Sequence, residues 1–150
     1  MSDAKPSGSE QAGRLRLVVA DDHAEVLQEI CDLLESEFDV VQAVSGGPEL
    51  VDAAESTRPN AVVSDISMPG MDGIEACSRI LKAGAAKAVV LLTMHDDPQV
   101  LERAVEAGIG GFILKVDAGE ELIDAVHAVY RGEQYWSRSV RNGRGRPAGV

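Results

Sequence analysis

The sequence has few cysteines, few aromatic residues and no long apolar run. Its two cysteines, Cys31 and Cys77, form no Cys-x-x-Cys pair and lie near no histidine-rich segment, which argues against a disulfide framework and a zinc site. No apolar run approaches the roughly 20 residues of a membrane-spanning helix, and the first residues lack a signal-peptide core. We therefore expect a cytoplasmic protein without a membrane segment.

Basic residues are also scarce, with 14 Lys and Arg against 25 Asp and Glu and a formal net charge of −11. This balance argues against a DNA-binding body, because sequence-independent affinity for DNA comes mainly from cations on phosphates. The exception is segment 137–150, which has four arginines and no acid. Because it is rich in glycine and lacks an apolar period, we interpret it as a basic linker or tail.

The length suits a single domain. Residues 1–13 are predicted to be a disordered leader, and residues 14–136 the domain. Within the domain, apolar runs of strand length alternate with segments of helical period, which is typical of βαβ units around a parallel sheet. Strands are predicted at 15–20, 39–44, 60–65, 88–93 and 111–114, with helices through 26–34, 50–54, 74–82, 98–108 and 120–131.

Polar residues follow or close four of these strands. Asp21 and Asp22 come after the first, Asp65 and Thr93 close the third and fourth, and Lys115 comes after the fifth. Because the carboxyl ends of parallel strands meet at one edge, these side chains are expected to converge. Three carboxylates would repel one another without a cation. Mg²⁺ suits such an all-oxygen site and commonly pairs carboxylates with phosphate oxygens.

This arrangement predicts chemistry on phosphorus. An ionised Asp65 is suited to attack a phosphoryl group and form an acyl phosphate, and it needs no general base because it has no proton to lose. Lys115 would stabilise the charge on the transferring oxygens. The hydroxyl of Thr93 would donate to one of the same oxygens.

Four segments, in order along the chain, resemble the marker regions of the response-regulator receiver domains of two-component signalling. They are Leu17–His23, Val63–Gly73, Leu91–Asp97 and Gly111–Lys115. As a set these motifs are highly specific, although each alone would be weak. The resemblance implies a flavodoxin-like (βα)5 domain, that is, a doubly wound five-stranded parallel sheet in the order 2-1-3-4-5.

The resemblance also implies a role for each residue that carries it. By position, Asp65 is the phosphoacceptor, and Asp22, Asp65 and the backbone carbonyl of Ser67 hold Mg²⁺. Asp21 acts mostly through a metal-bound water.

Further residues are assigned by the same resemblance. Thr93 and Lys115 bind the phosphoryl group, and Phe112 is an aromatic switch whose rotamer follows Thr93. His95 and Ser67, each two residues after a site residue, are interpreted as tuning the lifetime of the acyl phosphate. Phe112 is equally well interpreted as a core residue, and His95 as an exposed loop residue.

The resemblance implies partners as well. The donor is a phosphohistidine on a sensor histidine kinase or phosphotransfer protein, and the domain catalyses only its own phosphorylation and hydrolysis, so we do not expect an enzyme. Phosphorylation is expected to bias a two-state surface of the fourth helix, fifth strand and fifth helix. The expected outputs are phosphorylation-dependent homodimerisation and transcription regulation.

One departure from the family pattern affects the loop after Lys115. Many receivers have a cis proline there, but this chain has Val116, and a cis bond before a residue other than proline costs ~3 kcal/mol. The NarL/FixJ-like subclass, which carries a C-terminal helix-turn-helix, often lacks that proline, and residues 125–136 resemble it. Such a DNA-binding module is absent from this sequence, so we expect contact with DNA only through a module outside it.

Simpler interpretations exist for each residue. Asp22 fits a helix N-cap, Asp65 an Asx turn and Lys115 a solvated charge, but all would have to coincide. Three alternative functions are a stand-alone phosphorelay intermediate, a phosphatase of the haloacid-dehalogenase type and a flavin carrier. The phosphatase mechanism requires a second acid two residues after Asp65, where this chain has Ser67. A flavin carrier requires a phosphate-binding loop after the first strand, where the carboxylates of Asp21 and Asp22 would repel the phosphate.

Overall fold

The computed structural model describes residues 13–94 and 96–144. The predicted leader lies outside these ranges except for Gly13, and His95 lies outside them too.

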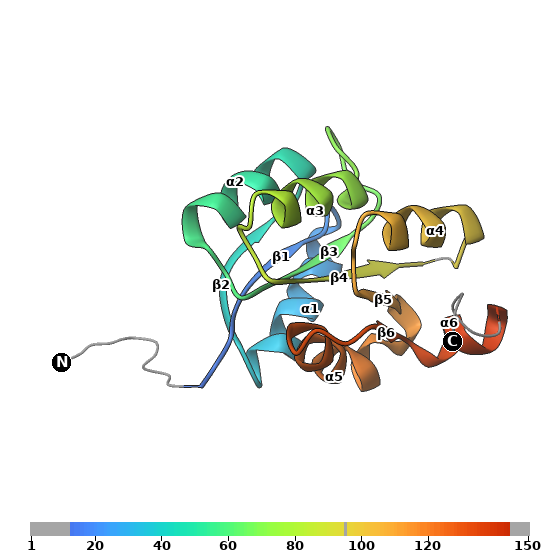
Figure 1. Cartoon of the computed structure of the whole chain (residues 1–150). Coiled ribbons are helices and arrows are strands. Elements are labelled where there is room, and N and C mark those ends of the chain that lie inside the picture. The colour runs from blue at the N-terminus through green and yellow to red at the C-terminus, as the bar shows by residue number, and fades with distance from the viewer. Residues whose placement is uncertain (1–12, 95, 145–150) are drawn as a thin grey trace.

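Six strands form one central sheet in which every neighbouring pair is parallel. They are β1 (Arg16–Ala20), β2 (Asp39–Val44), β3 (Ala61–Asp65), β4 (Ala88–Thr93), β5 (Gly111–Leu114) and β6 (Tyr135–Trp136). Their order across the sheet is β2-β1-β3-β4-β5-β6 (Figure 1). The predicted order 2-1-3-4-5 is confirmed, with the short strand β6 added beside β5.

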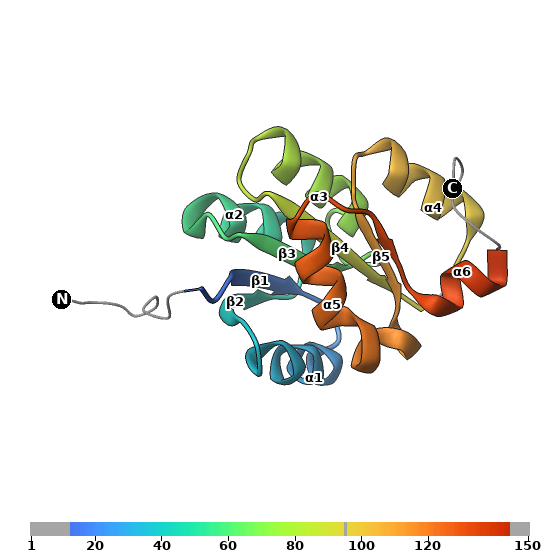
Figure 2. The same cartoon turned by 60° about the horizontal axis from the view of Figure 1, so that its bottom comes forward.

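The helices cover both faces of this sheet. They are α1 (Ala24–Glu35), α2 (Gly47–Thr57), α3 (Gly73–Lys82), α4 (Pro98–Glu106), α5 (Ala118–Tyr130) and α6 (Arg138–Arg144), with a 3-10 turn η1 (Lys115–Asp117) before α5. Figures 1 and 2 show α2, α3 and α4 over one face and α1 and α5 over the other. The doubly wound α/β fold is therefore confirmed. None of the described helices is both long and apolar enough to span a membrane.

The core consists of two clusters, one on each side of the sheet. Along β1, Leu17 and Val19 belong to the cluster under α1 and α5, whereas Val18 and Ala20 belong to the cluster on the opposite face. Every residue of the central strands β3 and β4 is buried. Strands covered on both faces are apolar at nearly every position, which is why they stand out in the sequence as short continuous apolar runs.

Local signals fix the ends of several helices. Asp72 and Asp97 are the N-caps of α3 and α4, and their carboxylates accept hydrogen bonds from the backbone N–H groups of Glu75 and Gln99, each at 2.8 Å. Such caps satisfy N–H groups that have no partner within the helix.

The C-terminal part contains two elements that the sequence analysis did not predict. Strand β6 pairs with β5, and helix α6 lies in segment 137–150, which we had interpreted as a linker or tail. Ser137 and Val140 are completely buried and Trp136 is nearly so. The first residues of this segment therefore pack against the rest of the protein. The position of the domain boundary itself stays a prediction.

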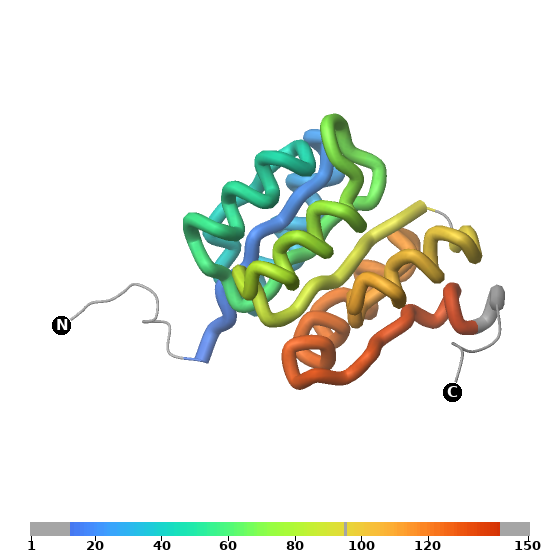
Figure 3. The backbone as a smooth tube through the Cα atoms, turned by 45° about the horizontal axis from the view of Figure 1, so that its top comes forward, coloured from blue at the N-terminus to red at the C-terminus, as the bar shows by residue number. Residues whose placement is uncertain are grey.

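The topology places the loops that follow the strands at one edge of the sheet, because parallel strands share the direction of their carboxyl ends. Figure 3 shows the end of β1 beside the loop between β3 and α3. This edge carries the candidate site.

Candidate functional site

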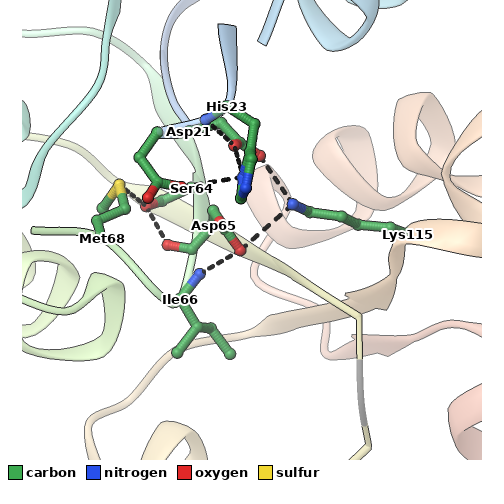
Figure 4. A network of polar contacts seen from close by, with 8 residues as sticks. Asp21, His23, Ser64, Asp65, Ile66, Met68 and Lys115 are labelled. Atoms are coloured by element: carbon green, nitrogen blue, oxygen red, sulfur yellow. Dashed lines mark hydrogen bonds and ion pairs between the residues drawn. The ribbon is translucent and has the colours of Figure 1, made fainter. Parts of the chain in front are cut away.

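The site lies at the carboxyl ends of four adjacent strands. Asp21 follows β1, Asp65 and Thr93 close β3 and β4, and Lys115 follows β5. The register pairs Asp65 with Leu92, so Thr93 lies on the neighbouring strand one residue further along. The structure brings the acidic residues and Lys115 together as the sequence analysis predicted (Figure 4).

Lys115 lies between two carboxylates. Its Nζ atom is 2.8 Å from Oδ2 of Asp21 and 3.4 Å from Oδ1 of Asp65. The lysine side chain is only 13% exposed and the two carboxylates less than that. These charges are therefore largely removed from water. Their mutual attraction is stronger in this buried setting than it would be at the surface. The interpretation of Lys115 as a solvated surface charge is wrong.

Asp21 is held from a second side by the start of α1. Its Oδ1 atom accepts a hydrogen bond of 2.9 Å from the backbone N–H of His23. The ring Nδ1 of His23 lies 3.5 Å from Oδ1 of Asp21 and 3.2 Å from Oδ1 of Asp22. The N-cap position of α1 is His23, without a side-chain cap hydrogen bond. The simpler interpretation of Asp22 as the N-cap is therefore wrong, and its carboxylate is about one-third exposed (32%) at the mouth of the site.

Asp65 is buried and only 6% exposed. Burial raises the pKa of its carboxyl group above the ordinary value, and the neighbouring charge of Asp21 adds to this, while Lys115 and the N–H of Ile66 oppose it. That N–H donates to Oδ1 of Asp65 at 2.8 Å. The residue is thus an acid whose ionised form depends on nearby positive charge.

The loop after Asp65 is held tightly at both ends. The backbone N–H of Gly73 donates to the carbonyl oxygen of Ile66 at 2.7 Å, and a Cβ atom at Gly73 would lie 2.0 Å from the carbonyl oxygen of Asp65. The hydroxyl of Ser64 donates to the same carbonyl oxygen at 2.7 Å. Ser67 lies within this loop and is exposed.

Thr93 and Phe112 lie beneath the surface of the site. Thr93 is 9% exposed, and Phe112 is 2% exposed within the cluster that packs under α2, α3 and α4. Burial suits Phe112 as a core residue, and its role as a switch stays a prediction. His95, predicted to tune the site, lies outside the described residues.

The acidic group fits a hard divalent cation. Asp21, Asp22, His23 and Asp65 each offer a ligand atom, and these atoms lie within 4.8 Å of one another. Three of the four donors are carboxylates, the ligands that Mg²⁺ prefers, and the open side toward Asp22 leaves room for the waters that Mg²⁺ usually keeps. The residues present therefore fit the predicted metal.

His23 was not among the predicted site residues, although its position directly after two acids was a usable signal. The closer contact of Lys115 with Asp21 than with Asp65 was not predicted either. The ends of parallel strands indicate that residues meet but not which pairs form.

A family model described as the response regulator receiver domain matches residues 17–127. The oxygen regulatory protein NreC of Staphylococcus carnosus is 35% identical over 124 residues, covering 81% of this chain and 57% of that protein. The chain thus spans little more than half the length of the curated relatives it matches.

Solved structures are similar over most of the chain. The isolated REC domain of RcsB from Salmonella enterica serovar Typhimurium, studied with the phosphomimetic BeF3⁻, has a TM-score of 0.78 at 27% identity, covering 87% of this chain and 98% of that chain. A LuxR-family two-component response regulator from Aurantimonas sp. SI85-9A1 has a TM-score of 0.80 at 30% identity, covering 87% and 94%.

Proposed function

The chain belongs to the response regulator receiver domain family, and from this premise we propose that it is a phosphoacceptor switch that takes a phosphoryl group on Asp65. The observation that carries the proposal is the position of Lys115 Nζ, 2.8 Å from Asp21 and 3.4 Å from Asp65 in a buried acidic site. A cation held against the predicted nucleophile is what phosphoryl transfer requires, because negative charge accumulates on the transferring oxygens.

The reaction is a single displacement at phosphorus. An oxygen lone pair of the ionised Asp65 forms the new O–P bond while the P–N bond of the donor's phosphohistidine breaks. The electron pair of that bond stays on the imidazole nitrogen. Hydrolysis later returns the Asp65 carboxylate and inorganic phosphate, so the protein acts on itself and does not turn over a separate substrate.

The chain's own residues have distinct parts in this step. Lys115 neutralises charge on the phosphoryl oxygens, and Thr93, buried beside Asp65 on the neighbouring strand, offers its hydroxyl to one of them. Asp22, Asp65 and the carbonyl of Ser67 would hold Mg²⁺, with Asp21 contributing through a bound water. When bound, Mg²⁺ supplies positive charge that favours the ionised Asp65 and the incoming phosphoryl group.

The consequence of phosphorylation is a changed surface formed by α4, β5 and α5. The added charge and hydrogen-bond acceptors at Asp65 shift a two-state equilibrium of this surface, sensed through Thr93 and Phe112. The donor is a sensor histidine kinase or a phosphotransfer protein, and the output is a homodimer or an altered partner. Regulation of transcription would act through a DNA-binding module outside this sequence.

A phosphatase of the haloacid-dehalogenase type is less well supported. That chemistry needs an acid two residues after the nucleophile, whereas this position holds the exposed Ser67. A general acid for the leaving group is thus missing at the place where that mechanism needs it.

The test is incubation of the chain with acetyl phosphate, with and without Mg²⁺, followed by intact-mass measurement. We expect one added phosphoryl mass that requires Mg²⁺ and is absent from Asp65→Asn. Asp32→Asn, which removes an exposed carboxylate from α1, is the matched control and should be labelled like the wild type. An adduct that persists in Asp65→Asn would contradict the proposal.

A further inference from the structure

The loop that carries Lys115 has little hydrophobic support of its own. Strand β5 ends at Leu114, and the short turn η1 leads directly into α5. The next side chain, Val116, is 81% exposed and so does not anchor the turn in the core. None of the described peptide bonds is cis. The position of Lys115 therefore depends on polar contacts made to this loop from elsewhere.

Ser137 provides the first of these contacts, immediately before Lys115. Its hydroxyl oxygen accepts a hydrogen bond of 3.0 Å from the backbone N–H of Leu114. Its own N–H donates to the carbonyl oxygen of Phe112 at 3.1 Å. Ser137 is completely buried. It thus extends the pairing of β6 with β5 to the last residue before Lys115.

Ser139 provides the second contact, two residues after Lys115. Its backbone N–H and its hydroxyl donate to the two oxygens of Asp117, at 2.9 Å and 2.8 Å. Burial pushes the pKa of Asp117 upward, but the hydrogen bonds from Ser137 and Ser139 outweigh it and hold the pKa below its ordinary value. Asp117 is the last residue of η1, so both ends of the Lys115 loop are tied to one segment.

This segment is itself firmly held. Glu121 of α5 is buried, and its carboxylate accepts hydrogen bonds from the backbone N–H of Arg138, at 3.0 and 3.2 Å, and from the hydroxyl of Tyr135 at 2.8 Å. Trp136 and Val140 lie in the same buried cluster as Phe112. Residues 135–140 are therefore a fixed support, in which β6 pairs with β5 and leads into α6 (Figure 1).

We infer that Ser137 and Ser139 are positioning residues for the phosphorylation site, acting through Leu114 and Asp117 to hold Lys115 against Asp21 and Asp65. This inference rests on the proposed function and deepens it: residues beyond the matched range 17–127 complete the site. The effect is reciprocal. If the hydrogen bonds of Ser137 and Ser139 favour one position of Lys115, a ligand that stabilises another position must weaken those hydrogen bonds by the same free energy.

The test uses the full chain with Ser137→Ala and Ser139→Ala combined, and it measures two quantities. The first is the rate of Mg²⁺-dependent phosphorylation by phosphoramidate. This rate should fall about tenfold or more, because a reaction slows steeply when a catalytic group is no longer held in its productive position. The second is the rate at which a small amine-reactive reagent labels Lys115, relative to the rate at which it labels the exposed Lys82 in the same molecule. Labelling of Lys115 should rise about tenfold, the effect expected when two hydrogen bonds are lost.

Controls separate positioning from general loosening. Reaction of the completely buried thiol of Cys77 reports global opening and should stay as slow as in the wild type. Ser56→Ala, at an exposed position of α2, removes a hydroxyl that donates to the carbonyl oxygen of Ala53 in the same helix, and it should change neither rate. A variant that combines Ser137→Ala with Ser139→Thr, which keeps a hydroxyl at position 139, should recover part of the phosphorylation rate that the double alanine variant loses. Asp117→Ala should slow phosphorylation as the double alanine variant does.

The outcomes distinguish this inference from the proposed function. Unchanged phosphorylation and unchanged labelling of Lys115 in the double variant would overturn the inference and leave the proposed function intact. Faster labelling of Lys115 together with faster reaction of Cys77 would also overturn it, because the variant would then have loosened the whole fold. If the wild type accepts no phosphoryl group, the proposed function fails, whereas the labelling result still decides whether Ser137 and Ser139 position Lys115.

Discussion

The ammonium group of Lys115 contacts Asp21 more closely than it contacts Asp65, with Nζ 2.8 Å from Oδ2 of Asp21 and 3.4 Å from Oδ1 of Asp65. The other oxygen of Asp21 accepts the N–H of His23. Both oxygens of Asp21 are therefore engaged by the protein. This agrees with a role of Asp21 at the metal through a bound water. Asp22, whose side chain is more exposed than that of Asp21, is then the carboxylate available for direct binding to the metal.

Removing the lysine is predicted to change both the acidity and the reactivity of Asp65. In Lys115→Met the pKa of Asp65 should rise further, because Lys115 is the main group that opposes the effect of burial. The phosphorylation rate should fall by about 100-fold, as is typical when one stabilising group is removed from a charged transition state. Carbon-13 NMR titration of the carboxyl group without divalent ions, and a mass time course, measure the two effects.

Lys82→Met is the matched control for this prediction, because Lys82 is exposed at the end of α3. It should alter neither quantity. A pKa of Asp65 that stays the same or falls in Lys115→Met would contradict the electrostatic account of the site.

The raised pKa of Asp65 also predicts a pH-dependent effect on stability. A carboxyl group whose pKa is raised by folding contributes stability below its unfolded pKa of about 3.9, and this contribution is lost as the pH rises through the folded pKa. At pH 7, Asp65→Asn should therefore raise the melting temperature above that of the wild type. At pH 3 the two proteins should melt together.

Thermal melts of both proteins at pH 3 and pH 7 without divalent ions measure this difference. A lower melting temperature of Asp65→Asn at pH 7 would show that the contact with Lys115 outweighs the cost of burial.

Metal binding is predicted to stabilise the native state. At a Mg²⁺ concentration ten times its dissociation constant, the gain should be about 1.4 kcal/mol, because the ion binds the folded state only. The shift should be reduced in Asp22→Asn and Asp65→Asn. Glu29→Gln, which removes an exposed carboxylate from α1, should respond to Mg²⁺ as the wild type does. Equal shifts in all four proteins would exclude the assigned ligands.

The close approach of Gly73 to Asp65 predicts a large cost for a single methyl group. In Gly73→Ala the new Cβ atom would lie 2.0 Å from the carbonyl oxygen of Asp65, so the loop must shift, and we expect a loss of about 2 kcal/mol in urea unfolding. Gly119→Ala in α5 meets no atom within 4 Å and should be neutral or stabilise by about 0.4–1 kcal/mol. Similar values for the two variants would contradict the tight packing of this loop.

Four of the five main strands, β1, β3, β4 and β5, were predictable because each is a short apolar run closed or followed by a polar residue at the same edge of the sheet. Strand β6 has two residues and gives no such pattern. Helix α6 was missed because it contains three arginines and a single apolar residue, the buried Val140, which cannot form an apolar period. What fixes α6 is carboxylates that are distant in sequence, Asp117 and Glu121.

The site was predictable to the same depth. The convergence of Asp21, Asp65 and Lys115 follows from parallel strands alone. The pairing of Lys115 with Asp21 depends on the geometry of two side chains that are 94 residues apart in the sequence. The support from Ser137 depends on the edge strand β6, for which the sequence shows no recognisable pattern.

The most direct test of the central claim is chemical trapping of the acyl phosphate. The chain is treated with acetyl phosphate and Mg²⁺, reduced with borohydride, which converts an acyl phosphate into an alcohol, and then mapped by peptide mass spectrometry. We expect homoserine in place of aspartate at position 65, with no other acid modified. Reduction at a different acid, or none in a protein that has gained the phosphoryl mass, would contradict it.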